Sequence, residues 1–388
     1  MSMRFADEEG RLVFYGWTDY LLLNLVNTKD SYYPDKKADL IVFNLKRVSP
    51  DLVGAIRDSG VFENVYILRS YREDELTGFK DKFVRLLSGR KYYRYYANQL
   101  EALVGNTEYR ALFTGAFWSE TLHLIRYMFA NSPQMEINFV SEGTASFQDI
   151  KVLQMCMPRG GAREVIFRKL HYAKSYNKAC KLFRNIYNYG QCGSRSCELL
   201  LPQVGKSKSL EGILNQVAAC IDINPYAKAR FYYFVPPRHA GQVDVAAQEQ
   251  RIFGKILEMT KPQDVLVRLH PTCQKRNFYS AGAYLDTGAA MPEVAFSQVD
   301  LTEKVLVSPN STALLTPKLL FDKEPNLIMT HRLYKIRKLK EEQRNDAFFR
   351  QIFALYNEKQ RVFAPSTIEE LNEIVLRLGK NEACGGLE

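Results

Sequence analysis

Two short apolar runs in the last third of the chain most constrain its fold. Residues 264–269 read Asp-Val-Leu-Val-Arg-Leu, residues 304–307 read Lys-Val-Leu-Val, and a proline follows each run closely. Their length and β-branched content are typical of buried parallel strands. The runs therefore predict an α/β fold built on a parallel sheet.

Polar residues follow each of these runs. His270 and Pro271 close the first, while Ser311 and Thr312 follow the second and open an apolar pattern that predicts a helix to about residue 320. Residues at such strand ends point into the crevice where open α/β sheets bind ligands. Hydroxyls, first-turn amides and a protonatable imidazole suit a phosphate. The alternative interpretation is an ordinary strand-end histidine and an ordinary helix cap.

Length and charge limit the class of protein. With 388 residues, the chain predicts about two domains. Its net charge of +10 favours acidic partners, namely nucleotides, nucleic acid or an anionic membrane surface. Seven scattered cysteines, a polar amino terminus and no apolar run of about 18 residues predict a cytoplasmic protein, soluble or peripheral on a membrane.

The first half of the chain alternates strands with helices. Strands are predicted at 11–16, 38–44, 64–68, 109–113 and 135–140. This spacing indicates a doubly wound parallel sheet. Thr18 or Asp19 is expected to cap the first helix, and no G-x-G-x-x-G follows the first strand, which disfavours an NAD site. Residues 152–201 predict a helical region with a loop.

A carboxylate stands at the end of the fifth predicted strand. The sequence there is Ser141-Glu142-Gly143, and the glycine allows a sharp turn after the carboxylate. A carboxylate in a crevice at a strand end can serve as a general base. A solvated turn residue is the alternative interpretation of Glu142.

The second half repeats the strand, loop and helix pattern. A strand at 230–235 is stopped by two prolines, and a polar loop containing His239 and Asp244 leads to a helix at about 246–259. We rank these two residues as secondary candidates for the crevice. The predicted organisation is a first Rossmann-like domain at 1–205, a second at 206–365, and a terminal helical segment at 366–388.

The order of three short motifs resembles that of bacterial sialyltransferases with the GT-B fold. The motifs are Ser141-Glu142-Gly143, His270-Pro271 and Ser311-Thr312. The opening Thr18-Asp19-Tyr20 and the turn 234–237 look most like the lipooligosaccharide sialyltransferases, glycosyltransferase family 52. The chain departs from the family pattern in Ser141, where an acid is frequent, and in Thr312, where a second serine is usual.

This resemblance implies a GT-B fold, in which two Rossmann-like domains face a central cleft. The domain at 1–205 would be on the acceptor side, the domain at 206–365 would bind the nucleotide sugar, and the helix at 366–388 would pack back on the first domain. It implies an inverting transfer of sialic acid from CMP-sialic acid to a hydroxyl of a lipooligosaccharide or capsule-type acceptor. Glu142 is the implied base, with Asp244 as its rival, and His270 would protonate or neutralise the leaving phosphate. No metal or other cofactor is expected, because a histidine and a helix terminus can neutralise one phosphate.

The donor-binding residues that follow from this assignment are Pro271, Ser311, Thr312, Thr18, Asp19 and, for the ribose, Glu324. The implied partners are the CMP-sugar and an anionic glycolipid or oligosaccharide on the inner membrane face. The basic run 331–340 is either a solvated helix face or a contact with that membrane. Another nucleotide-sugar donor and a nucleic-acid ligand are the alternatives, and a homodimer is left open.

Overall fold

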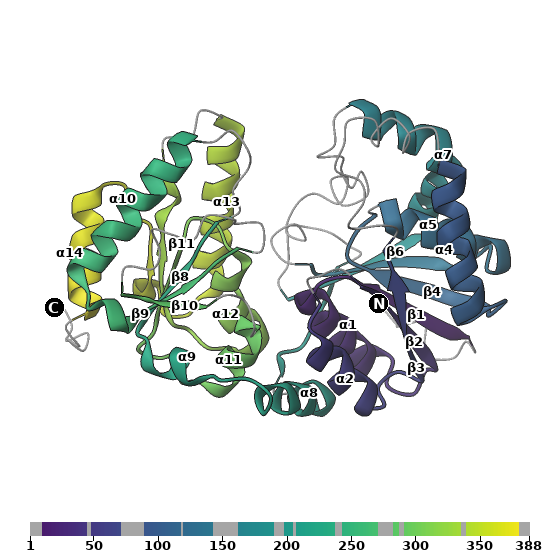
Figure 1. Cartoon of the computed structure of the whole chain (residues 1–388), viewed down its shortest axis with the longest axis horizontal. Helices are drawn as coiled ribbons and strands as arrows, with labels where there is room; N and C mark the ends of the chain where they lie inside the picture. The colour runs from purple at the N-terminus through teal and green to yellow at the C-terminus, as the bar shows by residue number, and fades with distance from the viewer. Residues whose placement is uncertain are drawn as a thin grey trace. The chain divides into compact units, whose positions relative to one another are not determined.

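The computed structural model describes residues 10–44, 48–70, 89–117, 119–142, 162–189, 198–204, 207–236, 243–270, 282–286, 291–334 and 339–379. The chain forms two compact units, Met1–Ile213 and Leu214–Glu388. Each unit is built around its own parallel sheet (Figure 1). The predicted pair of Rossmann-like α/β domains is confirmed. The division falls within α8 (Lys208–Ala218), later than the predicted residue 205.

Within the described residues the first sheet has seven parallel strands in the order β3-β2-β1-β4-β5-β6-β7. They are β1 (Arg11–Gly16), β2 (Ala38–Asn44), β3 (Asn64–Arg69), β4 (Tyr109–Thr114), β5 (Glu136–Val140), β6 (Phe183–Asn188) and β7 (Glu198–Leu200). The chain winds outward from β1 to β3 and returns to β4 on the other side of β1. Open α/β sheets bind ligands at the carboxyl ends of strands beside such a reversal.

Helices cover both faces of the first sheet (Figure 1). One face carries α1 (Asp19–Tyr32) and α2 (Pro50–Asp58), and the other carries α4 (Gly89–Val104), α5 (Ser119–Asn131) and α7 (Ala162–Lys181). The predicted cap of α1 is confirmed, because Thr18 Oγ1 accepts a hydrogen bond from Leu21 N at 3.3 Å.

The five strands predicted for this unit are confirmed, but β6 and β7 were missed. The interpretation of 152–201 as helix and loop is confirmed for α7 and wrong at β6 and β7, while residues 152–161 and 190–197, which include the predicted loop, lie outside the described residues. The sequence of β6, Phe-Arg-Asn-Ile-Tyr-Asn, mixes polar and apolar residues, so it lacks a clear strand period. Its pairing is supported by a side chain instead, since Asn138 Oδ1 accepts hydrogen bonds from Asn185 N and Nδ2 at 3.2 and 3.3 Å.

The second sheet, as far as it is described, has six parallel strands in the order β10-β9-β8-β11-β12-β13. They are β8 (Phe231–Phe234), β9 (Val265–Arg268), β10 (Tyr284–Asp286), β11 (Val305–Ser308), β12 (Asn326–Met329) and β13 (Val362–Phe363). The winding reverses between β8 and β11. The strands predicted at 230–235, 264–269 and 304–307 are confirmed as β8, β9 and β11. By contrast, β10 and β13, with three and two residues, are too short to show a pattern.

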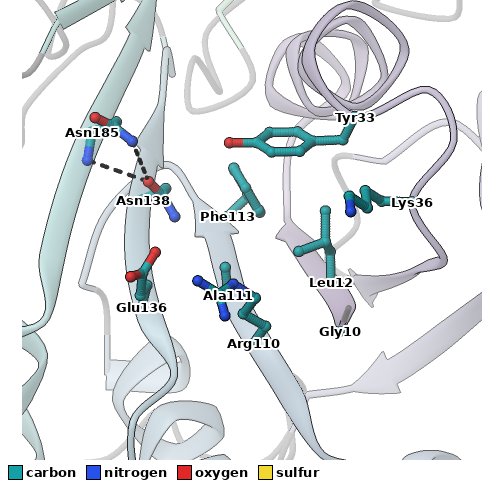
Figure 2. Close-up of a pocket in the computed structure, with 10 residues that line it drawn as sticks. All are labelled: Gly10, Leu12, Tyr33, Lys36, Arg110, Ala111, Phe113, Glu136, Asn138 and Asn185. Carbon is teal, nitrogen blue, oxygen red and sulfur yellow. Dashed lines mark hydrogen bonds between the residues drawn. The ribbon is translucent and has the colours of Figure 1, made fainter. Parts of the chain in front are cut away.

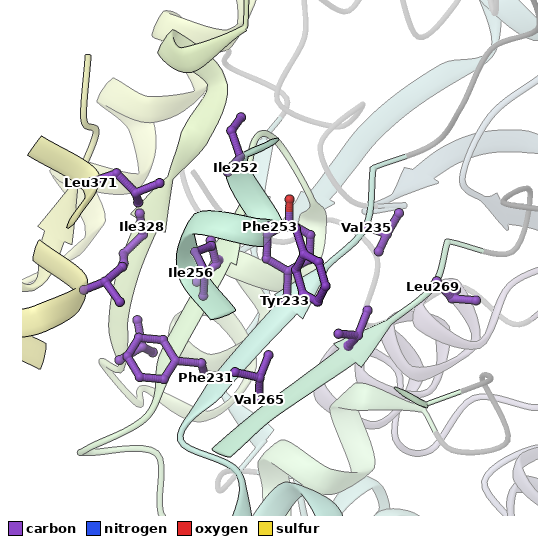
Figure 3. Close-up of a cluster of buried hydrophobic side chains, with 14 residues drawn as sticks. Phe231, Tyr233, Val235, Ile252, Phe253, Ile256, Val265, Leu269, Ile328 and Leu371 are labelled. Atoms are coloured by element: carbon purple, nitrogen blue, oxygen red, sulfur yellow. The ribbon is translucent and has the colours of Figure 1, made fainter. Parts of the chain in front are cut away.

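The helices of the second unit are α9 (Asn224–Lys228), α10 (Val243–Met259), α11 (Pro292–Gln298), α12 (Thr316–Phe321), α13 (Leu339–Leu355) and α14 (Ile368–Gly379). The prediction that the last helix packs on the first domain is wrong. Leu371 and Val375 of α14 are fully buried in the core of the second unit, in one cluster with Ile252 and Ile256 of α10 (Figure 3). Helix α14 presents an apolar face, and α10 offers the matching apolar surface.

Gly254 lies in the interior of α10, and a Cβ atom added there would meet no atom within 4 Å. We expect Gly254→Ala to raise the free energy of unfolding by about 0.5–1 kcal/mol, because alanine loses less backbone entropy in a helix. Urea unfolding followed by circular dichroism measures this. Gly105→Ala is the contrasting variant, since Gly105 has φ +54°, and it should destabilise the fold. Equal effects of both variants would contradict the argument.

Candidate functional site

Glu142 lies at the carboxyl edge of the first sheet, two residues beyond β5. Its Oε1 accepts a hydrogen bond of 2.7 Å from the indole Nε1 of Trp17, which directly follows β1. Trp17 is only 6% exposed, whereas Glu142 is half-buried. The indole N–H therefore holds the carboxylate in one orientation at the edge where the sequence predicts it.

Gly115 makes room for this contact. Strand β4 lies between β1 and β5, so the side chain of Glu142 reaches Trp17 across the end of β4, where Gly115 follows Thr114. A Cβ atom on Gly115 would lie 3.0 Å from Glu142 Oε2 and 3.1 Å from Glu142 Cβ. Such distances are shorter than ordinary van der Waals contacts, so a side chain here would displace the carboxylate.

The backbone that carries Glu142 is also held. Asn24 of α1 donates from Nδ2 to Ser141 O at 2.8 Å, and its Oδ1 accepts from Tyr189 OH at 2.9 Å. Ser141 N donates to Tyr187 O at 2.9 Å. Trp17, Asn24 and Tyr189 were not predicted as residues of the site. The position of Trp17 directly after the first strand was the available signal.

Two buried hydroxyls at this edge lack a hydrogen-bond partner among the described residues. They are Thr114 Oγ1, at the end of β4, and Ser141 Oγ, directly after β5. Buried polar atoms are seldom left unsatisfied, and the exceptions include groups with a role in chemistry and groups that bind a water molecule. Both hydroxyls belong to residues next to Gly115 and Glu142 in the sequence.

Thr18 and Asp19 both act at helix starts. Thr18 caps α1, and Asp19 Oδ1 accepts a hydrogen bond of 2.8 Å from Ser49 N, where α2 is capped. These contacts explain the two residues without a ligand. Their predicted contact with the donor stays a prediction.

His270, Ser311 and Thr312 all follow strands of the second sheet at its carboxyl edge. His270 lies two residues beyond β9, and Ser311 lies three residues beyond β11. The end of β11 is tied to β8 at the reversal, because Ser308 Oγ donates to Phe234 O at 2.9 Å. The predicted placement at one sheet edge is confirmed.

The helix predicted at 311–320 is wrong in its form. A 3-10 turn (Thr312–Leu314) is followed by the short α12, which begins at Thr316 with Pro317 in its first turn. Proline has no N–H to continue the helix from the preceding turn. Ser311 caps the 3-10 turn, since its Oγ accepts from Ala313 N at 3.3 Å, and Leu314 N donates to Ser311 O at 3.2 Å. Any phosphate contact here therefore rests on the hydroxyls more than on helix amides.

Glu324 is engaged inside the second unit. It accepts hydrogen bonds of 2.9 Å each from Asn357 N and Glu358 N, and it pairs with Lys318. Although partial burial opposes the shift, these donors lower the pKa of Glu324 below its usual value. We therefore leave Glu324 out of the proposed donor site.

Four residues of the predicted motifs and loops fall wholly or partly outside the described residues. Pro271 lies outside the described residues, as do Gly143 and His239. Asp244 belongs to the first turn of α10, but its side chain is not described. Asp244 therefore stays the predicted rival of Glu142 as the base.

A buried ion pair next to His270 was not predicted. Arg268, the last residue of β9, donates from Nη1 to Asp286 Oδ2 at 2.6 Å, and Tyr226 OH donates to the same oxygen. Asp286 ends the neighbouring β10. This pair ties β9 to β10 two residues before His270, so it supports the strand end that carries the histidine.

A small cavity lies at the opposite, amino edge of the first sheet. Its volume is about 20 Å³, and its lining includes Lys36, Arg110, Glu136 and Asn138 (Figure 2). That is room for a water molecule, not for a sugar. The cavity is therefore separate from the edge that carries Glu142.

His331 follows β12 at the carboxyl edge of the second sheet. The prediction of a solvated face for the basic run 331–340 is wrong at this residue, because His331 is 3% exposed. Its Nε2 is 3.0 Å from Asp346 Oδ1, and its buried Nδ1 has no hydrogen-bond partner within the described part of the chain. Burial lowers the pKa of His331 below its usual value, although Asp346 acts in the opposite direction.

This shift predicts a pH dependence of stability. Between the lowered folded-state pKa and the unfolded-state value of about 6.5, the unfolded chain binds more protons. The free energy of unfolding should therefore fall as the pH falls through that window. We expect His331→Gln to flatten this dependence, as measured by urea unfolding between pH 5 and 7.5 at fixed salt. Asp346→Asn should extend the window to lower pH, because it lowers the folded-state pKa of His331 further and leaves the unfolded-state value unchanged. An unchanged profile in both variants would contradict the assignment.

No described helix is long and apolar enough to span a membrane. Within the described ranges, no three His, Cys, Asp or Glu residues form a group that could hold a metal ion. The expectation of a metal-free reaction stays a prediction.

No protein-family model and no curated protein sequence matches the chain. Among solved structures, the chain is similar to CalG4, the calicheamicin glycosyltransferase, with 9% identity, a TM-score of 0.47 and coverage of 97% of this chain and 91% of that one. It is also similar to a UDP-glucosyltransferase from Polygonum tinctorium, with 10% identity, a TM-score of 0.47 and coverage of 96% and 94%.

A third similar structure is UDP-GlcNAc 2-epimerase from Neisseria meningitidis bound to UDP-GlcNAc. Identity is 10%, the TM-score is 0.46, and the alignment covers 95% of this chain and 98% of that chain. Similarities this distant identify neither the substrate nor the reaction of the present chain.

Proposed function

We propose that the protein is an inverting glycosyltransferase that moves sialic acid from CMP-sialic acid to a hydroxyl of an acceptor glycan. One observation carries most of the proposal. Glu142, the acidic residue of the first family-like motif, lies at the carboxyl edge of its sheet and is held there by Trp17. A carboxylate in a fixed orientation at such an edge is suited to general-base catalysis.

The proposed roles divide between the two units. Glu142 of the first unit takes the proton from the acceptor hydroxyl as its oxygen attacks the anomeric carbon. The bond from that carbon to the phosphate oxygen of CMP breaks on the opposite side, so the configuration inverts. His270 of the second unit donates a proton to the departing phosphate or neutralises it, and the hydroxyls of Ser311 and Thr312 bind the phosphate oxygens.

The leaving group makes a metal-free reaction chemically reasonable. CMP departs with a single phosphate, whose charge an imidazolium and two hydroxyls can compensate. A nucleotide diphosphate leaving group carries more charge and more often needs a cation. Nucleotide identity and metal dependence are therefore linked in this proposal.

Calorimetric titration with CMP and with UDP, each in the presence of a chelator, tests the donor class. We expect CMP to bind without metal and UDP to bind more weakly. A matched variant with alanine at Ser311 and Thr312 should weaken CMP binding. Clear UDP binding without CMP binding would overturn the sialyltransferase proposal and favour another nucleotide-sugar transferase. Hydrolysis and transfer of CMP-sialic acid then test the reaction.

Association with an anionic membrane forms a separate part of the proposal. It rests on the net charge of +10 and on the basic residues within 331–340. Neutralising Lys335, Arg337, Lys338 and Lys340 together should reduce sedimentation with vesicles that contain anionic lipid. Unchanged sedimentation would refute this contact and would leave the transferase proposal untouched.

A further inference from the structure

We propose that Trp17 is a positioning residue that sets the orientation of the Glu142 carboxylate during transfer. This inference rests on the proposed function for the role of Glu142 as the base. The contact itself is observed in the structure, where the indole Nε1 of Trp17 donates a hydrogen bond of 2.7 Å to Glu142 Oε1. Hydrogen bonds to ionised carboxylates are short and strong, so one N–H can select one orientation.

The indole is itself held on two sides. Its ring packs on that of Tyr15, with centroids 5.5 Å apart, and Trp17 is 6% exposed. The next residue, Thr18, caps α1. Because both neighbours are fixed, the N–H is presented from a rigid position at the end of β1.

The carboxylate is likewise held from its own side. Asn24 donates to Ser141 O, which fixes the backbone just before Glu142. Gly115 leaves the space above the end of β4 that the side chain occupies. A glutamate side chain has three rotatable bonds, and the indole N–H restrains its far end. A displaced base loses efficiency steeply, since about 1 Å of misplacement can cost about 100-fold in rate.

Trp17→Phe removes the N–H and keeps an aromatic ring in the same place. We expect kcat for transfer to fall about 10-fold to 100-fold, with CMP affinity unchanged. The acid limb of the kcat profile should move to higher pH, because the ionised carboxylate loses a donor. A merely structural role for the indole would not shift that limb.

Tyr15→Phe is the matched control. It removes one polar atom from a buried aromatic ring that packs on Trp17, and that hydroxyl has no hydrogen-bond partner among the described residues. We expect its kcat and pH profile to match those of the unaltered protein.

Gly115→Ala is the second test of the positioning role. The Cβ atom of the alanine should displace the Glu142 carboxylate and lower kcat as Trp17→Phe does.

A spectroscopic readout tests the contact without any donor. The chain has two tryptophans, so in a Trp118→Phe background the emission reports Trp17 alone. We expect the emission of Trp17 to change with pH as the Glu142 carboxylate ionises, and we expect this change to be absent in Glu142→Gln. Tyr15 and Glu120 are ionisable groups that interact electrostatically with each other near this edge. Both are present in the proteins with and without Glu142→Gln, so they cannot account for a difference between the two pH titrations.

The outcomes separate the two proposals. The Trp17 emission could change with pH only when Glu142 is present while the protein transfers no sugar from any CMP-sugar. That result would refute the proposed function and leave the Trp17–Glu142 contact standing. Transfer by the unaltered protein, with kcat and pH profile unchanged in Trp17→Phe, would overturn the positioning role. Emission that titrates equally with and without Glu142 would refute the contact.

Discussion

Glu142→Gln is expected to lower the turnover of transfer by about 10²-fold to 10⁴-fold. Glutamine has almost the same shape, and its carbonyl oxygen can still accept the hydrogen bond from Trp17 Nε1. It cannot take a proton from an acceptor hydroxyl. The expected loss is therefore in kcat, measured by steady-state transfer from CMP-sialic acid.

CMP binding distinguishes a lost base from a lost fold. His270, Ser311 and Thr312, which are proposed to bind the phosphate of CMP, belong to the second unit, so calorimetry should give the same CMP affinity for Glu142→Gln as for the unaltered protein. Asp244→Asn is the matched variant at the rival carboxylate. If Asp244→Asn abolishes turnover and Glu142→Gln does not, the base is Asp244 and the role proposed here for Glu142 is wrong.

The strands that the sequence predicts are those whose buried character shows as a continuous apolar run. Val265–Arg268 and Val305–Ser308 are of this kind, because both faces of a central parallel strand are covered. Strand β6 has only its second half buried, and its asparagines break the pattern. Helix α14 shows its apolar face in the sequence, but Leu371 and Val375 do not reveal which surface they will cover.

The sequence also predicts the candidate site only in part, since it predicts residues at strand ends but not the partners they contact. Glu142 and His270 follow from strand ends, which depend on local sequence. The partner of Glu142 does not, because Trp17 is 125 residues away and reaches it only through the order β1, β4, β5. Strand order is a tertiary property that periodicity does not encode. The cap at Thr18 was predictable because its partner, Leu21, is three residues away.

Asp39 is the clearest polar residue that the strand pattern concealed. It sits second in the run Ala-Asp-Leu-Ile-Val-Phe-Asn of β2 and is 1% exposed. Its carboxylate accepts hydrogen bonds from Arg11 at 2.7 and 2.9 Å, from Asn64 at 2.9 Å and from Tyr109 at 2.7 Å. These donors come from β1, β3 and β4. One carboxylate therefore joins four adjacent strands across the reversal of the sheet.

Asp39→Ala should lower the free energy of unfolding of the first unit by about 3–5 kcal/mol, because it removes one member of a buried ion pair and leaves the other donors unsatisfied. Both tryptophans lie in the first unit, so urea unfolding followed by their fluorescence reports that unit. Glu63→Ala is the matched control, since Glu63 pairs with the same Arg11 but is 43% exposed. Exposed pairs contribute about 1 kcal/mol or less. Similar losses in both variants would show that charge balance around Arg11 matters, and that the buried network of Asp39 does not hold the strands together.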